Sequence, residues 1–157
     1  IGAYAGLQWM LDNYEWHTAS LSQFLLRDIK EQGGRPTTVS ILLNAKAQPL
    51  RATQYTPSTL IRSVINFPVM NLLLRAKANP NTSSYQGRFA LHRRMTLQTA
   101  TCLLEAKADP AYASPEGRTA LGYRHKNVDV TLLLLKHGAR PTDADLRHVP
   151  MLREILD

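Results

Sequence analysis

The stretch Leu134-Leu135-Lys136-His137-Gly138-Ala139-Arg140-Pro141 decides the fold, because it is the last of four copies of one phrase. Earlier copies occupy residues 42–49, 73–80 and 103–110. Each copy has a leucine pair, two linking residues, Lys-Ala or Gly-Ala, a polar residue and proline. The second leucine falls at positions 43, 74, 104 and 135, so the spacing is 31, 30 and 31 residues. A regular period of about 20 to 50 residues indicates supersecondary units stacked in a row.

Between the phrases, apolar residues recur at three- and four-residue steps, which predicts paired helices and an all-α fold. Ser20 or Ser22 is expected to cap the first long helix, which ends at about Glu31 before a glycine pair. In the third unit, a short helix is expected to start at residues 89–92 and to continue through Met95. Gly138 is expected to end the last helix of the repeats in the left-handed conformation.

The repeats are expected to span residues 18–141, with different segments on either side. Residues 1–17 hold both tryptophans, Trp9 and Trp16, and predict a short amphipathic helix from Gly6 onward. This segment either caps the end of the array or anchors a partner, because tryptophan buries a large area yet keeps a polar edge. Residues 142–157 are expected to form the C-terminal cap, which Pro150 limits to two short turns or helices.

The totals are those of an ordinary globular protein, with 157 residues, 44% hydrophobic and 20% charged. The charge-free stretch near the start reaches only from residue 1 to residue 11, so no transmembrane helix is expected. The single cysteine, Cys102, favours a setting inside the cell, in the cytoplasm or an organelle such as the chloroplast, over secretion. Because the sequence begins with Ile1, we expect a processed or partly observed chain.

Basic residues dominate the middle of the chain. Between Glu31 and Glu105 there are nine Lys and Arg residues and no acidic residue, within a net charge of +7 for the whole chain. Such a span predicts a surface that attracts an acidic partner. The alternative is a set of scattered basic residues on solvated helix faces.

The segment Gly117-Arg118-Thr119-Ala120-Leu121, followed by a helix and a Leu-Leu-x-x-Gly-Ala ending at Ala139, resembles the ankyrin repeat. Residues 89–92 are similar to the family's Thr-Pro-Leu-His segment in two of four positions. The resemblance covers about residues 18–141 and implies a solenoid of stacked helix-turn-helix units joined by hairpin-like loops. The units are two or three residues shorter than the 33 residues usual in the family. By the same resemblance, His92 is a structural residue whose ring bonds loop backbone of the neighbouring repeat.

The phrase also departs from the family at its glycine. Lys46, Lys77 and Lys107 stand where the family has the glycine that ends the second helix. A side chain in left-handed backbone costs about 1–2 kcal/mol. We therefore expect weaker capping at these three positions than at Gly138, and a less stable array.

In an ankyrin-like stack, the loop tips and the first helices face one side and bind partners there. The resemblance therefore implies a set of partner-binding residues, to which the two tryptophans are added as a second candidate anchor. The set is Tyr85, Gln86, Arg88, Arg93, Arg94, Glu116, Arg118, Arg124, His125, Lys126, Trp9 and Trp16. Arginine at such positions pairs with carboxylate or phosphate.

The sequence contains no catalytic constellation, so no enzymatic activity, cofactor or metal site is expected. The five histidines fall in different units, Cys102 lies on the apolar side of a leucine-rich helix, and there is no phosphate-binding glycine loop. The expected function is that of a protein-protein interaction module, an adaptor or accessory subunit that docks an acidic protein surface. The alternatives are a peripheral subunit of an organellar photosynthetic or respiratory complex, and an RNA-associated peripheral ribosomal protein. Nucleic acid ranks lower, because aromatic residues are not interleaved with the basic ones along the sequence.

Overall fold

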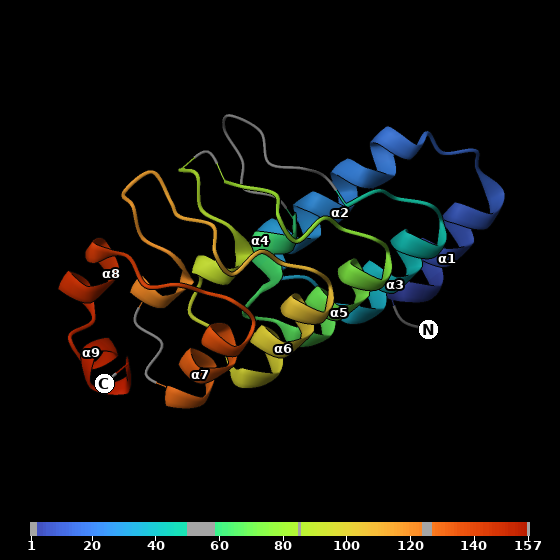
Figure 1. Cartoon of the computed structure of the whole chain (residues 1–157). Helices are drawn as coiled ribbons and strands as arrows, with labels where there is room; N and C mark the ends of the chain where they lie inside the picture. Colours follow the sequence, from blue (N-terminus) through green and yellow to red (C-terminus); the bar gives the residue numbers. More distant parts are fainter. Residues whose placement is uncertain (1–2, 50–58, 85, 124–126, 157) are drawn as a thin grey trace. The chain divides into compact units, whose positions relative to one another are not determined.

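A computed structural model describes residues 3–49, 59–84, 86–123 and 127–156. The regular structure in these ranges is helical and includes no β-strand, so the expected all-α class is confirmed for them. The chain divides into two compact units, Ile1–Arg51 with Ser58–Asn79 and Ala52–Pro57 with Pro80–Asp157. Figure 1 labels the α-helices of both units.

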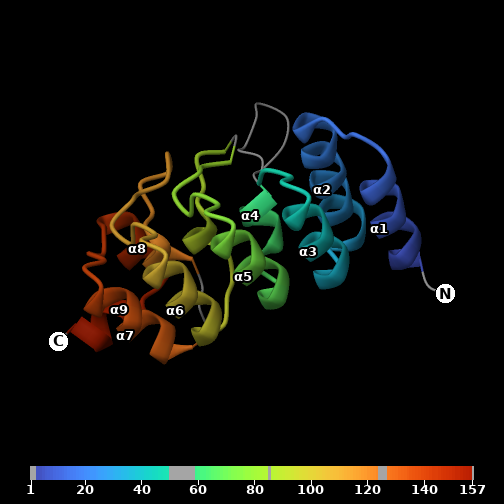
Figure 2. The ribbon, with the colours of Figure 1, turned by 90° about the vertical axis from the view of Figure 1, so that its right-hand side faces the viewer.

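The first unit is built from helices of unequal length. They are α1 (Ala3–Asn13), α2 (Thr18–Gln32), α3 (Pro36–Asn44), α4 (Thr59–Ser63) and α5 (Phe67–Arg75). Both α3 and α4 pack against α2 on one side and α5 on the other, while α1 lies against α3. Figure 2 shows α1, α2 and α3 side by side. The unit is therefore a stack of helix pairs with α1 at its outer end.

Apolar residues at helical spacing form the core of this unit. Leu21, Leu25 and Ile29 recur on one face of α2 and are almost fully buried. Val39 of α3 and Leu73 of α5 have no exposed surface. Full burial of such a side chain contributes about 1.5–3 kcal/mol. In each leucine phrase of this unit the first leucine, Leu42 or Leu73, is buried in this core.

The start of α2 differs from the prediction. The helix begins at Thr18 after His17, which makes no side-chain cap, so neither Ser20 nor Ser22 caps it. Ser22 is buried one turn inside α2, where its hydroxyl donates to Thr18 O at 2.6 Å and accepts from Gln48 N at 2.8 Å. Because the Ser22 hydroxyl already donates one hydrogen bond and accepts another inside the fold, it is not available to cap the start of α2. Likewise, α1 starts three residues before the expected Gly6.

All four leucine phrases end their helices in the same way. After α3, the backbone N–H of Ala47 donates to Leu42 O at 2.9 Å and that of Lys46 donates to Leu43 O at 3.0 Å. These two bonds define a Schellman motif, in which the residue after the last helical turn is left-handed. The φ angles of Lys46, Lys77 and Lys107 are 67°, 61° and 67°, and that of Gly138 is 93°. The predicted left-handed lysines are confirmed.

The second unit alternates single turns with longer helices. Its elements are the 3-10 turns η1 (Ala90–His92) and η2 (Ala120–Gly122) and the helices α6 (Leu97–Glu105), α7 (Val128–Lys136), α8 (Asp143–His148) and α9 (Met151–Leu156). The predicted continuation of the first turn through Met95 is wrong, because Arg93 is extended and Thr96 caps a new helix. The expected split of the C-terminal segment at Pro150 is confirmed, since α8 ends before it and α9 begins after it.

Candidate functional site

Two hairpin-like loops of the second unit have the same backbone, thirty residues apart. Ser84 N donates to Arg88 O at 2.8 Å, and Ser114 N donates to Arg118 O at 2.7 Å. Gly87 takes a φ of 65° at the first tip, where an added Cβ would lie 2.6 Å from the ring of Pro115 in the second loop. Gly87 therefore lies directly against Pro115, and only glycine fits at position 87.

The close packing brings two arginines onto one carboxylate. Arg88 Nη2 lies 3.2 Å from Glu116 Oε1, and Arg118 Nη2 lies 3.9 Å from Glu116 Oε2. Ser114 and Tyr123 also donate their hydroxyls to Oε2, at 2.8 Å and 3.3 Å. We call Arg88, Ser114, Glu116, Arg118 and Tyr123 the arginine cluster.

The ring of Tyr123 supports both guanidinium groups. The Cζ atoms of Arg118 and Arg88 lie 4.9 Å and 5.6 Å from its centroid. Cation-π contact at this range contributes about 0.5–1 kcal/mol at an exposed site. The side chain of Arg118 is 21% exposed and that of Arg88 is 36% exposed, so the cluster is ordered yet open to solvent.

Charge in the cluster is only partly balanced. The Ser114 hydroxyl, followed by Arg88, holds the pKa of Glu116 below its ordinary value, so the carboxylate is charged near neutral pH. Burial opposes the charge of Arg88, but its contacts with Glu116 and Tyr123 prevail and leave its pKa raised. Two guanidinium groups thus face one carboxylate. Arg88 Nε is buried and lacks a hydrogen-bond partner among the described residues, which leaves a donor unused.

Aromatic rings continue the cluster toward the interior of the unit. Phe89 stacks on Tyr112 with centroids 3.8 Å apart, and His92 stacks on Tyr123 at 5.0 Å. His92 Nδ1 accepts from Phe89 N at 3.2 Å, so Nε2 carries the proton and donates to Tyr112 O, also at 3.2 Å. The expected bond from His92 to the backbone of the next loop is confirmed. Burial lowers the pKa of His92, because the charged ring would lose its hydration inside the fold.

Sequence reasoning missed these aromatic residues. Along the chain, Tyr123 lies five residues after Arg118 and 35 after Arg88, yet in space it contacts both guanidinium groups directly. The expectation that aromatic and basic side chains are not interleaved is therefore wrong for this cluster. The signal that could have found Tyr123 is the thirty-residue repeat, which aligns it with Arg93 and so with the loop-facing end of a turn.

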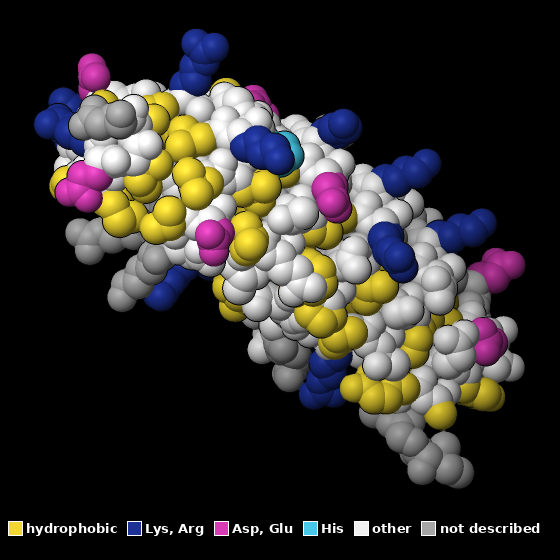
Figure 3. Space-filling model, turned by 60° about the horizontal axis from the view of Figure 1, so that its bottom comes forward, with side chains coloured by type: hydrophobic (Ala, Val, Ile, Leu, Met, Phe, Trp, Pro, Cys, Tyr) yellow, Lys and Arg dark blue, Asp and Glu magenta, His cyan; other side chains and the backbone are white. Residues whose placement is uncertain are grey.

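The other loop residues of the predicted set lie apart from the cluster or outside the described ranges. Gln86 is exposed at the first loop tip, and Arg93 and Arg94 are exposed after η1. Tyr85, Arg124, His125 and Lys126 lie outside the described residues. Figure 3 shows a face on which Lys and Arg side chains stand apart from one another, with hydrophobic side chains exposed between them. Convergence of guanidinium groups therefore distinguishes Arg88 and Arg118 from isolated surface charges.

The two tryptophans lie in the first unit. Trp9 of α1 is 57% exposed and meets Tyr14 edge-on, with centroids 6.1 Å apart. Trp16 follows α1, donates its indole N–H to Met10 O at 3.2 Å and contacts Phe24 edge-on. The predicted site residues are thus divided between two compact units.

Chemistry at the remaining candidates is limited. Within the described ranges, no three His, Cys, Asp or Glu side chains gather in a way that could hold a metal ion. Burial, with a smaller contribution from Glu105, raises the pKa of the Cys102 thiol and so lowers its reactivity. Searching those ranges for a helix long and apolar enough to span a membrane finds none. Comparison with known proteins gives no matching family model and no matching curated protein.

Proposed function

We propose that the protein is a non-enzymatic interaction module that docks an acidic protein surface at the arginine cluster. The observation that carries the proposal is the pair of guanidinium groups that Tyr123 holds beside a single carboxylate. Arg88 and Arg118 are ordered before a partner arrives, so binding costs little of their rotamer freedom.

Repetition of local geometry supports an ankyrin-type solenoid as the framework. The Schellman motif occurs four times, the hairpin-like loop twice and the 3-10 turn twice, each at about thirty residues. The His92 bond to the next loop has the character that the family resemblance implies. Rigid loops on such a framework are a common way to present side chains to a protein partner.

Within this proposal, Glu116 is the internal counterpart of the partner's carboxylate. It was expected to face a partner, but it accepts hydrogen bonds from Arg88, Ser114 and Tyr123. An incoming carboxylate would share the guanidinium groups with Glu116 or displace it. Glu116→Gln should therefore strengthen binding of an acidic partner, whereas loss of either arginine should weaken it.

A charge-matched pair of variants tests the proposal. The double variant Arg88→Gln/Arg118→Gln is compared with Arg147→Gln/Arg153→Gln, which removes two exposed arginines from α8 and α9. After cross-linking in native extract, the partner is identified by mass spectrometry and its affinity measured with the purified protein. Loss of a hydrogen bond to a charged group costs about 1.5–3 kcal/mol, so the first variant should weaken binding at least about tenfold. Equal affinities for both variants would exclude the arginine cluster as the docking site.

The contact of arginines with an aromatic ring also favours a second candidate, association with RNA. Single-stranded RNA binds where bases stack beside basic groups, and Arg88, Arg118 and Tyr123 provide these chemical groups together. Binding of an oligouridine with a steep salt dependence, abolished by the double variant, would support RNA. Retention of protein partners after ribonuclease treatment would support the protein module, as an adaptor or as a peripheral subunit of a larger complex.

A further inference from the structure

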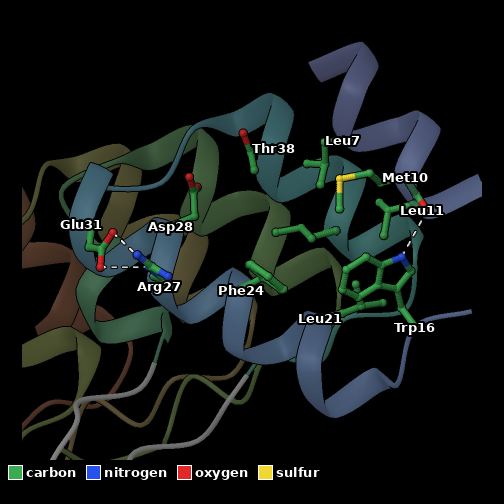
Figure 4. A pocket seen from close by; sticks show the side chains of 11 residues that line it. Leu7, Met10, Leu11, Trp16, Leu21, Phe24, Arg27, Asp28, Glu31 and Thr38 are labelled. Carbon is green, nitrogen blue, oxygen red and sulfur yellow. Dashed lines mark hydrogen bonds and ion pairs between the residues drawn. The ribbon is translucent and has the colours of Figure 1, made fainter. Parts of the chain in front are cut away.

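An apolar groove lies in the first unit, away from the arginine cluster in sequence. Its volume is about 360 Å³, and Figure 4 shows the side chains that line it. Leu7, Met10 and Leu11 come from α1, and Leu21 and Phe24 come from α2. Trp16, between the two helices, points its ring toward Phe24, with centroids 6.0 Å apart.

Large apolar side chains in and beside the groove remain in contact with water. Phe24 is 49% exposed and Met10 is 40% exposed, although both line it. Trp9 and Tyr14 of the neighbouring surface are more exposed still. Exposed aromatic residues and methionine concentrated in one place are typical of the central part of a protein interface.

The far end of the groove is polar and acidic. Figure 4 shows Asp28 and Glu31 there, with Arg27 bonded to Glu31 at 3.1 Å. The first 31 residues carry four acidic and two basic side chains, in a chain whose net charge is +7. Among the charged side chains that line the groove, Asp28 and Glu31 outnumber Arg27, so this end of the groove attracts basic groups over a distance of about one Debye length, 10 Å at 0.1 M salt.

The spacing of the lining residues on α2 fits a helical occupant. Leu21, Phe24, Asp28 and Glu31 recur at steps of three and four residues, so they share one face of the helix. Ten residues separate the first from the last, which is about 15 Å along the axis at 1.5 Å per residue. An apolar stripe of about three turns would lie along this face, beside α1, and its flanking basic residues would reach Asp28 and Glu31.

We infer that the groove between α1, α2 and α3 binds an amphipathic helix of a partner protein, with an apolar face and a basic flank. Apolar contacts at Phe24 and Trp16 provide affinity, and the acidic end sets the direction and the charge preference. This site is independent of the arginine cluster, which prefers an acidic partner. One chain would then join two proteins of opposite charge, as an adaptor does.

Tryptophan fluorescence provides a direct test. Trp9→Phe leaves Trp16 as the only tryptophan, so its emission reports on the groove. The probes are two 14-residue helical peptides with leucine on one face and either lysine or glutamate on the other. The lysine peptide should give a saturable blue shift and bind at least about tenfold tighter than the glutamate peptide, although the net charge of the protein opposes this order.

Matched variants locate the binding. In the Trp9→Phe background, Phe24→Ala should weaken the lysine peptide at least about tenfold, as expected when an aromatic anchor is removed. Ile65→Ala removes a side chain that is 75% exposed and outside the groove, so it should leave the affinity unchanged. Glu31→Lys should reduce or reverse the preference for lysine. Arg88→Gln/Arg118→Gln should not change binding of the lysine peptide, which separates this inference from the proposed function.

Several results would overturn the inference. Equal affinity for the two peptides would mean unspecific apolar contact, and equal effects of Phe24→Ala and Ile65→Ala would place the binding elsewhere. A blue shift with vesicles of anionic lipid in the absence of any shift with the lysine peptide would assign the groove to a membrane surface instead. Circular dichroism of each variant checks that its helices are intact.

Discussion

In the two 3-10 turns of the second unit, the backbone N–H at the start of the turn donates to different kinds of acceptor. Phe89 N and Thr119 N are thirty residues apart and begin equivalent turns. The first donates to Nδ1 of His92, within its own turn, at 3.2 Å. The second donates to Oδ1 of Asp145, on α8, at 3.0 Å. Gly122 stands where the first turn has His92, and an added Cβ there would overlap Asp145 Oδ1.

The difference shows how the last turn of the repeated sequence can be held by α8, which does not share the repeat. His92 joins its turn to the next loop through Tyr112 O. At the second turn, Asp145 accepts from the N–H and hydroxyl of Thr119 and from Thr142 N, and it has no exposed surface. A neutral ring therefore links two successive loops, whereas a buried carboxylate links the turn η2 to α8.

Replacing the buried carboxylate should have the largest effect. Asp145→Ala leaves the buried Thr119 N and the part-buried Thr142 N without these acceptors, and an unsatisfied buried donor costs about 1–3 kcal/mol. We expect the free energy of unfolding, measured in urea, to fall by about 3 kcal/mol. Asp143→Ala, an exposed neighbour in the same first turn of α8, should change it by less than about 1 kcal/mol.

A double-mutant cycle sharpens this result. Gly122→Ala should destabilise the unit by displacing Asp145, and the double variant with Asp145→Ala should lose less than the sum of the single losses. Gly6→Ala is the control, because a Cβ there meets nothing within 4 Å and the residue lies inside α1. Additive losses at positions 122 and 145 would show that the two do not act on each other.

The contribution of His92 to the free energy of unfolding should depend on pH. His92→Ala removes both ring bonds, each contributing about 1 kcal/mol, so the loss should be about 2 kcal/mol at pH 7.5. Burial lowers the pKa of His92 in the folded state below its unfolded value near 6.5. Its contribution is therefore complete above the unfolded pKa and decreases as the pH falls from there toward the folded pKa.

The measurement is the difference in unfolding free energy between the natural protein and His92→Ala at pH 7.5 and pH 5. We expect a smaller difference at pH 5. Titration of the His92 ring signals by NMR should give a pKa below the ordinary histidine value near 6.5. A larger difference in unfolding free energy at pH 5 than at pH 7.5 would contradict the assignment of His92 Nδ1 as an acceptor.

Features that depend on neighbouring residues in the chain could be predicted from the sequence. The leucine phrases predicted the helix ends, and the missing glycines predicted left-handed backbone at Lys46, Lys77 and Lys107. The extent of the third short helix was not predicted, because Thr96 and Thr99 form a capping pair that starts α6 instead.

Features that depend on contacts across the repeats were not predicted. Arg88, Glu116 and Arg118 were placed on loop tips, but their mutual pairing requires two loops in register. Asp145 has the sequence context of an ordinary acidic residue in a first helical turn, and only packing on Thr119 makes it a buried acceptor. The sequence therefore identified positions on the surface, and the structure was needed to find which of them face one another.

The smallest effect is expected at the helix ends, where equivalent positions again hold different residues. Lys77→Gly removes the strain of a side chain at a φ of 61°, which costs about 1–2 kcal/mol, but increases the freedom of the unfolded chain. The net gain in the free energy of unfolding should be less than about 1 kcal/mol. The same change at Lys30, inside α2, should destabilise by about 1 kcal/mol, since glycine is a poor helix former. Both changes remove the same side chain and the same charge. If Lys77→Gly raises the free energy of unfolding and Lys30→Gly lowers it, the cause is therefore the backbone conformation at the two positions. A loss of stability at Lys77 would mean that its side chain contributes more than the strain it introduces.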